Sequence, residues 1–293
     1  MPLCCPPGSW PQLLQSRDQL NAEERSVPER GVLVSIPSQS GGGSALPVYV
    51  VEPPEGTAVR GGILVFQDIY SVRVLKPSVR SGDRIGILCD TLAEAGYVVA
   101  LPSIFRDEPF DVAISGPDDG DFEKFNSFAQ NGGVAWFQKQ NYDKVGPDVK
   151  AAYEFLKTKI DGKPVGGLGF CYGCWLLSKA SSTGDIDLVA GVGCHPATVL
   201  EEAVFGGSEV GMLKALKQPT RFLWAGNDSE TYLADGDGRK AVEATGGDVI
   251  EFPDMLHGWV SRGDVSEAKV KRDVEKAMEL ILIFLDEKMN SAK

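Results

Sequence analysis

Short continuous apolar runs alternate along this chain with stretches in which apolar residues recur at helical spacing. The runs are typical of strands buried on both faces of a parallel sheet, and they lie at residues 62–66, 97–102, 165–170 and 188–194. Two more strands, which include charged residues, are expected at 220–225 and 248–252. The helical stretches include Ile85, Leu88, Leu92 and Ala95; Val149, Ala152 and Leu156; and Val270, Val274, Ala277, Ile281 and Leu285. This alternation predicts an α/β domain with a mostly parallel, twisted sheet and helices on both faces.

Three stretches depart from the simple alternation. Residues 31–36 and 46–51 are predicted to be two strands joined by a glycine-rich turn, and Pro47 near the start of the second suits an antiparallel sheet edge. Residues 1–30 are rich in proline and polar residues, which predicts a partly flexible leader before one domain over residues 31–293. Residues 107–142 are acidic, glycine-rich and aromatic, and we expect an excursion over one end of the sheet, a candidate lid. A further helix is expected near 230–245.

Composition narrows the class of partner. The net charge is −12 and the pI is near 4.7, which argues against nucleic acid or an anionic membrane surface because both attract basic proteins. No run approaches the roughly 18 apolar residues of a membrane span, and no secretory signal is evident. Six cysteines in 293 residues are too sparse for a disulfide scaffold. We therefore expect a cytoplasmic protein with a small-molecule substrate, as a monomer or homodimer.

The segment Gly169-Phe170-Cys171-Tyr172-Gly173 joins a predicted strand to a predicted helix. Its glycine spacing matches the nucleophile elbow, in which glycines two residues either side of the nucleophile let strand and helix pass closely. A cysteine at the apex benefits from the dipole at the helix N-terminus, and the N–H of the next residue points at a developing oxyanion. Cys171 is thus a candidate nucleophile.

Other interpretations of the same segment remain open. Cys171-Tyr172-Gly173-Cys174 is also a C-x-x-C, which can be a thioredoxin-like redox pair or half of a zinc site. A metal site is the weaker choice because no second pair has ligand spacing. Cys171 could instead be an inert thiol in a buried turn, as we expect for Cys89 and Cys194 in their apolar runs. A non-catalytic binding protein on the same fold is a further alternative.

A thiol nucleophile needs a base, and the chain contains only two histidines. His257 lies between the last predicted strand and the last helix, at the sheet edge where doubly wound proteins place their sites, and it is the favoured base. His195 also follows a strand and is assigned to the substrate pocket or its surroundings. Asp228 ends another strand and would orient the imidazole, although it could instead cap a helix near Glu230. The order Cys171, Asp228, His257 is that of α/β hydrolases.

Several sequence blocks resemble the dienelactone hydrolase family of α/β hydrolases, from about residue 30 to the end. They are Gln67-Asp68-Ile69-Tyr70, Leu101-Pro102-Ser103-Ile104-Phe105-Arg106, the elbow around Cys171, Ala225-Gly226-Asn227-Asp228, and His257-Gly258-Trp259 with Arg262. The resemblance implies the α/β-hydrolase fold, a Cys171, Asp228 and His257 triad, and no cofactor or metal. It also implies backbone oxyanion donors at Ile69 and Tyr172.

The resemblance further implies the remaining site residues. Asp68 would contact the resting thiol, Arg106 and Arg262 would anchor a substrate carboxylate, and Tyr70, His195 and Trp259 would line the substrate pocket. The implied activity is hydrolysis of a lactone or ester, including anionic ones, through a thioester on Cys171. Asp68 departs from the family's usual Glu, Cys174 stands where a glycine is common, and Ser103 replaces an Asp; these departures bear on substrate preference.

Overall fold

The fold is known from a computed structural model that describes residues 30–40, 45–70, 84–105 and 133–291. Within these ranges eight strands form one sheet in the order β1-β2-β4-β3-β5-β6-β7-β8. The strands are β1 (Val32–Ile36), β2 (Leu46–Val51), β3 (Gly61–Phe66), β4 (Tyr97–Pro102), β5 (Val165–Phe170), β6 (Ala190–Cys194), β7 (Thr220–Ala225) and β8 (Asp248–Phe252). Strands β4 to β8 and β3 pair in parallel, while β2 pairs antiparallel with both β1 and β4. The predicted fold class and its antiparallel edge are confirmed.

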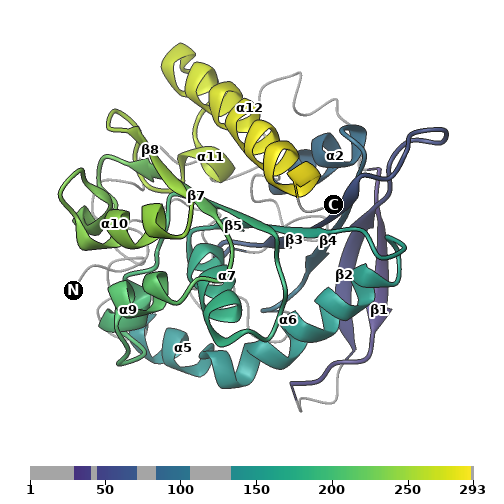
Figure 1. Cartoon of the computed structure of the whole chain (residues 1–293), viewed down its shortest axis with the longest axis horizontal. Coiled ribbons are helices and arrows are strands. Elements are labelled where there is room, and N and C mark those ends of the chain that lie inside the picture. Colours follow the sequence, from purple (N-terminus) through teal and green to yellow (C-terminus); the bar gives the residue numbers. More distant parts are fainter. Residues whose placement is uncertain (1–29, 41–44, 71–83, 106–132, 292–293) are drawn as a thin grey trace.

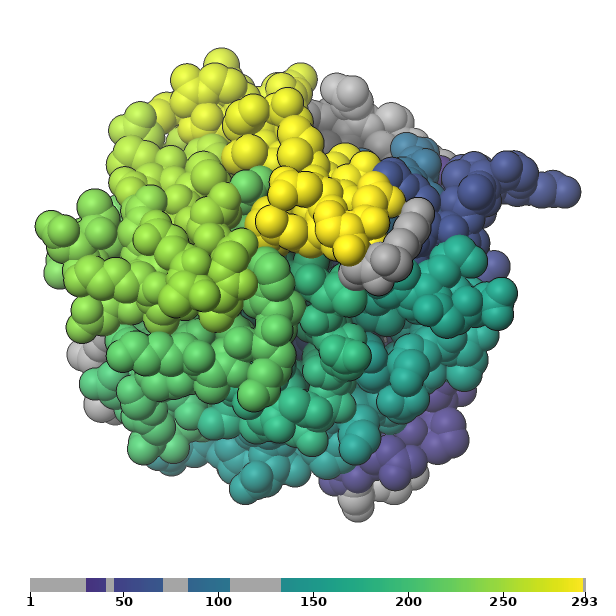
Figure 2. All heavy atoms as spheres, in the orientation of Figure 1, coloured from purple at the N-terminus to yellow at the C-terminus, as the bar shows by residue number. Residues whose placement is uncertain are grey.

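Helices cover both faces of the sheet (Figure 1). They are α2 (Arg84–Glu94), α5 (Val134–Lys139), α6 (Tyr142–Lys157), α7 (Tyr172–Thr183), α8 (Leu200–Ala203), α9 (Glu209–Lys214), the 3₁₀ helix η5 (Glu230–Tyr232), α10 (Asp237–Ala244), α11 (Trp259–Arg262) and α12 (Ala268–Ser291). Helices α2, α11 and α12 bury their apolar residues with one face of the strands, and α5, α6 and α7 do so with the other. Figure 2 shows α12 (yellow) on the outer surface of the first layer.

The register of the parallel strands brings their carboxyl ends to one edge. Phe66 lies opposite Gly169, Phe170 opposite Cys194, and Ala225 opposite Phe252. The loops that follow β3, β5, β6, β7 and β8 therefore meet at the same edge. This is the edge at which open α/β sheets hold their ligands.

Most predicted strands have their expected bounds, but the segment after β7 does not. The single helix expected near 230–245 is wrong, because the chain forms η5 and then a separate helix, α10. Gly236 lies between them, and a Cβ on this glycine would lie 2.1 Å from the Thr231 carbonyl oxygen. A helix continued through this point could not make that close backbone contact. Strand β6 begins at Ala190 rather than at 188, and α8, α9 and α11 had no counterpart in the prediction.

Two sequence predictions fall largely outside the described residues. The leader 1–30 overlaps the described chain only at Arg30, and the candidate lid 107–142 overlaps it only from residue 133. Both stay predictions, as does the domain boundary at residue 31. Among the described residues, no helix is both long and apolar enough to cross a membrane.

Candidate active site

The turn between β5 and α7 is a strained elbow with Cys171 at its apex. Cys171 has φ 54° and ψ −117°, a conformation that a residue with a side chain rarely adopts. The flanking glycines are required sterically: a Cβ on Gly169 would lie 2.6 Å from the Gly173 carbonyl oxygen, and one on Gly173 would lie 2.1 Å from that of Phe66. The elbow is thus packed directly against the end of β3, and it holds the Cys171 side chain at the start of α7.

Cys171 and Cys174 occupy different surroundings. Cys171 is 3% exposed and packs in the cluster of α6 and α7. Cys174 is fully buried in a separate cluster with β7 and α10, and its thiol lies 3.2 and 3.3 Å from the carbonyl oxygens of Gly169 and Cys194. Burial raises the pKa of the Cys174 thiol well above its usual range. Cys89 and Cys194 are buried free thiols, as expected.

His257 and Asp228 form a buried pair at this edge. His257 Nδ1 lies 2.5 Å from Asp228 Oδ1, and the backbone N–H of Ala225 donates to Asp228 Oδ2 at 2.8 Å. The N–H of His257 donates to the Asn227 side chain at 2.7 Å, which fixes the loop after β8 to the loop after β7. The helix-cap alternative for Asp228 is wrong, because the N-cap of η5 is Ser229.

His195 connects this pair to the elbow. The backbone N–H of Cys171 donates to the Cys194 carbonyl at 3.1 Å, and that of Ala197 donates to the Cys171 carbonyl at 3.2 Å. The His195 ring then packs edge-on against His257, with centroids 5.2 Å apart. The candidate nucleophile and base therefore lie on either side of one loop. His195 itself is fully buried, so it is a wall of the site and not a freely exposed contact.

The burial of His195 makes stability depend on pH. Desolvation, followed by the neighbouring His257, lowers the pKa of His195 well below its usual value. In the unfolded chain His195 takes up a proton near pH 6.5, whereas in the folded chain it stays neutral to a lower pH. The contribution of neutral His195 to stability is therefore intact above about pH 6.5 and decreases as the pH falls below it. Asparagine tolerates the positive φ at this position. Below about pH 6.5, the free energy of unfolding of the wild type should fall as the pH decreases. We expect this fall to be smaller in His195→Asn, by about 1 kcal/mol per pH unit.

Urea unfolding of both proteins at several pH values between about 5 and 7.5 measures this difference. Equal slopes in the wild type and His195→Asn would show that folding does not lower the pKa of His195.

The loop after β3 carries a carboxylate with two described partners. Asp68 Oδ1 accepts the N–H of Tyr70 at 2.9 Å, and Asp68 Oδ2 accepts the Ser261 hydroxyl at 3.1 Å. The side-chain amide of Gln67 donates to the Tyr70 carbonyl at 3.2 Å. Ile69 lies between these anchored residues and is fully buried. The backbone of this loop is thus held from both ends.

The short helix α11 carries two more of the predicted site residues. Arg262 is 3% exposed, and its guanidinium carbon lies 3.7 Å from the centre of the Tyr70 ring. This contact pairs two of the predicted substrate-binding residues. Trp259 instead packs on Phe252, with centroids 4.5 Å apart, in the cluster beneath α12. Arg106 lies outside the described residues.

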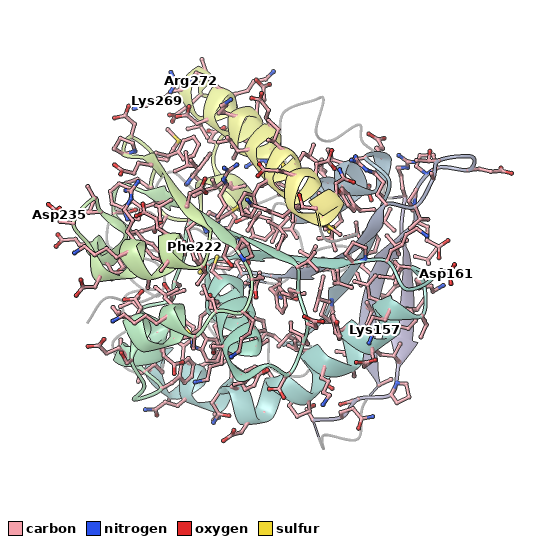
Figure 3. All side chains as sticks on the ribbon, in the orientation of Figure 1. Lys157, Asp161, Phe222, Asp235, Lys269 and Arg272 are labelled. Carbon is pink, nitrogen blue, oxygen red and sulfur yellow. The ribbon has the colours of Figure 1, made fainter. Side chains whose placement is uncertain are left out.

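Ser261 was not predicted from the sequence, although it touches two predicted site residues. Its hydroxyl bonds to Asp68 and lies 3.5 Å from His195 Nε2. A lone serine gives no signal in a sequence, because its partner Asp68 is 193 residues away. The two acidic residues Asp235 and Asp237, further along the chain from Asp228, are exposed, and Figure 3 shows Asp235 at the periphery of the molecule.

The donor groups of the described residues do not form a metal centre. No set of three or more His, Cys, Asp or Glu side chains in those ranges is arranged to hold a metal ion. The imidazole and carboxylate side chains at the strand ends are arranged in pairs and chains of hydrogen bonds. Such an arrangement can move protons and orient a nucleophile.

The sequence model of the dienelactone hydrolase family matches residues 46–289. The chain belongs to this family. The family's range includes the elbow, Asp228 and His257 together with all strands except β1. As a member of the family, the protein is a hydrolase of carboxylic esters or lactones.

Known proteins similar to this family member include both sequence relatives and solved structures. A protein of Aspergillus violaceofuscus named "Hydrolase pyvD" is 24% identical over 234 residues, covering 76% of this chain and 79% of its own. A "Carboxymethylenebutenolidase homolog" of Rattus norvegicus is 27% identical over 168 residues, covering 57% and 56%. The structure of a dienelactone hydrolase of Anabaena variabilis has a TM-score of 0.55 at 15% identity, covering 88% and 99%. A carboxyl esterase structure of Bacillus coagulans has a TM-score of 0.56 at 11% identity, covering 89% and 100%.

Proposed function

We propose that this protein hydrolyses a small ester or lactone through a thioester on Cys171, with His257 as base and Asp228 as the residue that orients it. The observation that carries the proposal is the buried 2.5 Å pair between His257 and Asp228, joined through the His195 loop to a cysteine held at φ 54°. A strained conformation at a nucleophile position is a common property of functional sites. The roles follow from this arrangement.

The reaction begins with transfer of the Cys171 thiol proton to His257. The sulfur electron pair forms a bond to the substrate carbonyl carbon, and the carbonyl π electrons move onto oxygen. When the oxyanion collapses, the C–O bond breaks and the leaving oxygen takes the proton from His257. A water molecule, deprotonated by His257, then attacks the thioester and releases the carboxylic acid and the thiol.

The backbone N–H groups of Ile69 and Tyr172 are the proposed oxyanion donors. Tyr172 is the first residue of α7, so its N–H has no acceptor within the helix. A Cβ on Gly173 would lie 2.7 Å from the Gln67 carbonyl oxygen, which indicates that the start of α7 and the loop after β3 are in contact. Two N–H groups from adjoining segments can therefore converge on one oxygen.

Arg262 is the proposed anchor for a negatively charged substrate group, together with Arg106 outside the described residues. The Tyr70 ring packs against the guanidinium of Arg262, and the planar fork of an arginine matches the geometry of a carboxylate. The net charge of −12 disfavours anions in general. A localised arginine is then required to attract an anionic ester or lactone. Free buried thiols suit a reducing compartment such as the cytosol.

A redox function of Cys171 and Cys174 is less well supported. The Cys174 thiol faces the backbone carbonyls of Gly169 and Cys194, and its raised pKa disfavours the thiolate that exchange requires. The redox interpretation also assigns no role to the pair of His257 and Asp228. Acyl transfer gives a role to Cys171, His257 and Asp228.

The acyl-enzyme is the intermediate that tests the proposal. Reduced protein is mixed with an activated aryl ester, quenched in acid after milliseconds to seconds, digested and analysed by mass spectrometry. We expect the acyl group on the peptide that contains Cys171, at the sulfur of Cys171 and not of Cys174, and loss of the label on treatment with hydroxylamine. Turnover with the acyl group on another side chain would contradict the proposal.

A further inference from the structure

Ser261 lies at the centre of a buried chain of polar groups beneath the proposed triad. Its hydroxyl is 3.1 Å from Asp68 Oδ2 and 3.5 Å from His195 Nε2, and the residue is 1% exposed. A hydroxyl has one proton to donate and lone pairs to accept with. Donation to Asp68 leaves Ser261 Oγ free to accept the N–H of His195. The chain therefore runs from His195 through Ser261 to Asp68.

The end of this chain reaches the proposed oxyanion donor. Asp68 accepts a hydrogen bond from Ser261 through one oxygen and from the N–H of Tyr70 through the other. Ile69 lies between Asp68 and Tyr70, so the orientation of its peptide group depends on where the Asp68 carboxylate is held. Ser261, on α11, contacts that carboxylate from a different segment of the chain.

Helix α11 provides a rigid support for Ser261. The buried guanidinium of Arg84, on α2, donates to the carbonyls of Val260 at 3.2 Å and Gly263 at 2.8 Å, on either side of Ser261. The Ser261 hydroxyl also lies 3.4 Å from the carbonyl of Gly258, the residue after His257. The serine is thus fixed relative to the loop that carries the proposed base.

We propose that Ser261 is a positioning residue that couples the oxyanion loop, residues 67–70, to the loop carrying His257. The inference rests on the proposed function, because it concerns the alignment of Ile69 with the same reacting carbonyl. An oxyanion donor acts on charge that develops in the transition state. Misalignment of the Ile69 N–H should therefore lower kcat and leave KM nearly unchanged.

Three substitutions of Ser261 and one matched control test the inference. Removing one oxyanion donor costs about 10²–10³-fold in kcat, so displacing it through Ser261→Ala should cost roughly 10- to 100-fold, with KM within about twofold. Ser261→Thr keeps the hydroxyl and should retain most of the activity, whereas the equally large Ser261→Val should not. Ser178→Ala is the control, because Ser178 is also fully buried and its hydroxyl has no hydrogen-bond partner among the described residues; it should leave kcat unchanged.

The outcomes separate this inference from the proposed function. Thermal unfolding of each variant establishes that it is folded, and the comparison of Thr with Val holds even if the alanine variant unfolds. Equal kcat values for Ser261→Thr and Ser261→Val would overturn the positioning role of Ser261. If Cys171 is still acylated in the wild type, the proposed function is unaffected by that result. Absence of acyl-Cys171 in the wild type would overturn the proposed function itself.

Discussion

Replacing Cys171 with alanine is expected to reduce kcat/KM for an activated ester by about 10⁴-fold or more, to the level left by binding and the oxyanion donors. The reason is that the proposed acyl-enzyme cannot form without the sulfur atom. Steady-state assays of the purified, reduced variant measure the loss. Cys171→Ser retains a nucleophile in the same elbow but presents a less acidic hydroxyl, so its activity should lie between those of the wild type and the alanine variant.

Cys174→Ala serves as the control for this experiment. The Cys174 thiol hydrogen-bonds to the backbone carbonyls of Gly169 and Cys194, and Cys174→Ala is expected to keep the wild-type rate. A Cys171→Ala protein that retains a tenth or more of the activity would rule out the thioester. A loss confined to Cys174→Ala would instead indicate a function for the second thiol.

Gly173→Ala is expected to destabilise the protein by about 3 kcal/mol or more. The added methyl group would lie 2.1 Å from the Phe66 carbonyl oxygen and 2.7 Å from that of Gln67. Both atoms belong to the backbone, so neither can move without displacing β3 or the oxyanion loop. The melting temperature should fall by roughly 6–12 °C, and hydrolysis should be impaired in the protein that remains folded.

Gly184→Ala separates this steric effect from backbone strain. Gly184 ends α7 with φ 78°, and no atom lies within 4 Å of its Cβ position. Alanine there should cost only about 1–2 kcal/mol, the cost of the left-handed conformation. If the two variants melt at the same temperature, the close approach at Gly173 is not what makes glycine necessary.

The sequence was sufficient where local pattern determines structure. Strand β4 and strand β7 have the predicted bounds, because the apolar residues of each are flanked by turn-forming residues, such as Gly96 before β4 and Gly226 after β7. Gly169 and Gly173 revealed the elbow because their spacing has a steric cause that does not depend on the rest of the chain. The scarcity of histidines left few choices for the base.

The predictions failed where structure depends on distant contacts. The broken helix after β7 results from Gly236 packing against Thr231, which apolar periodicity does not report. Ser261 gained its place in the site through Asp68 and His195, which are brought together only by the completed sheet. Trp259, which the family resemblance assigned to the substrate pocket, packs on Phe252 under α12, and its role in binding stays a prediction.

The order of the strands also determines when the thiol can become reactive during synthesis. Cys171 directly follows β5, at the middle of the sheet, whereas His257 follows β8 at its far edge. Chains emerge N-terminus first, so the segment that carries the sulfur leaves the ribosome well before the one that carries the imidazole. Until β8 pairs with β7, the nascent protein holds Cys171 without its proposed base. Under the proposed mechanism, activation of Cys171 would therefore wait until the last strand of the sheet is in place.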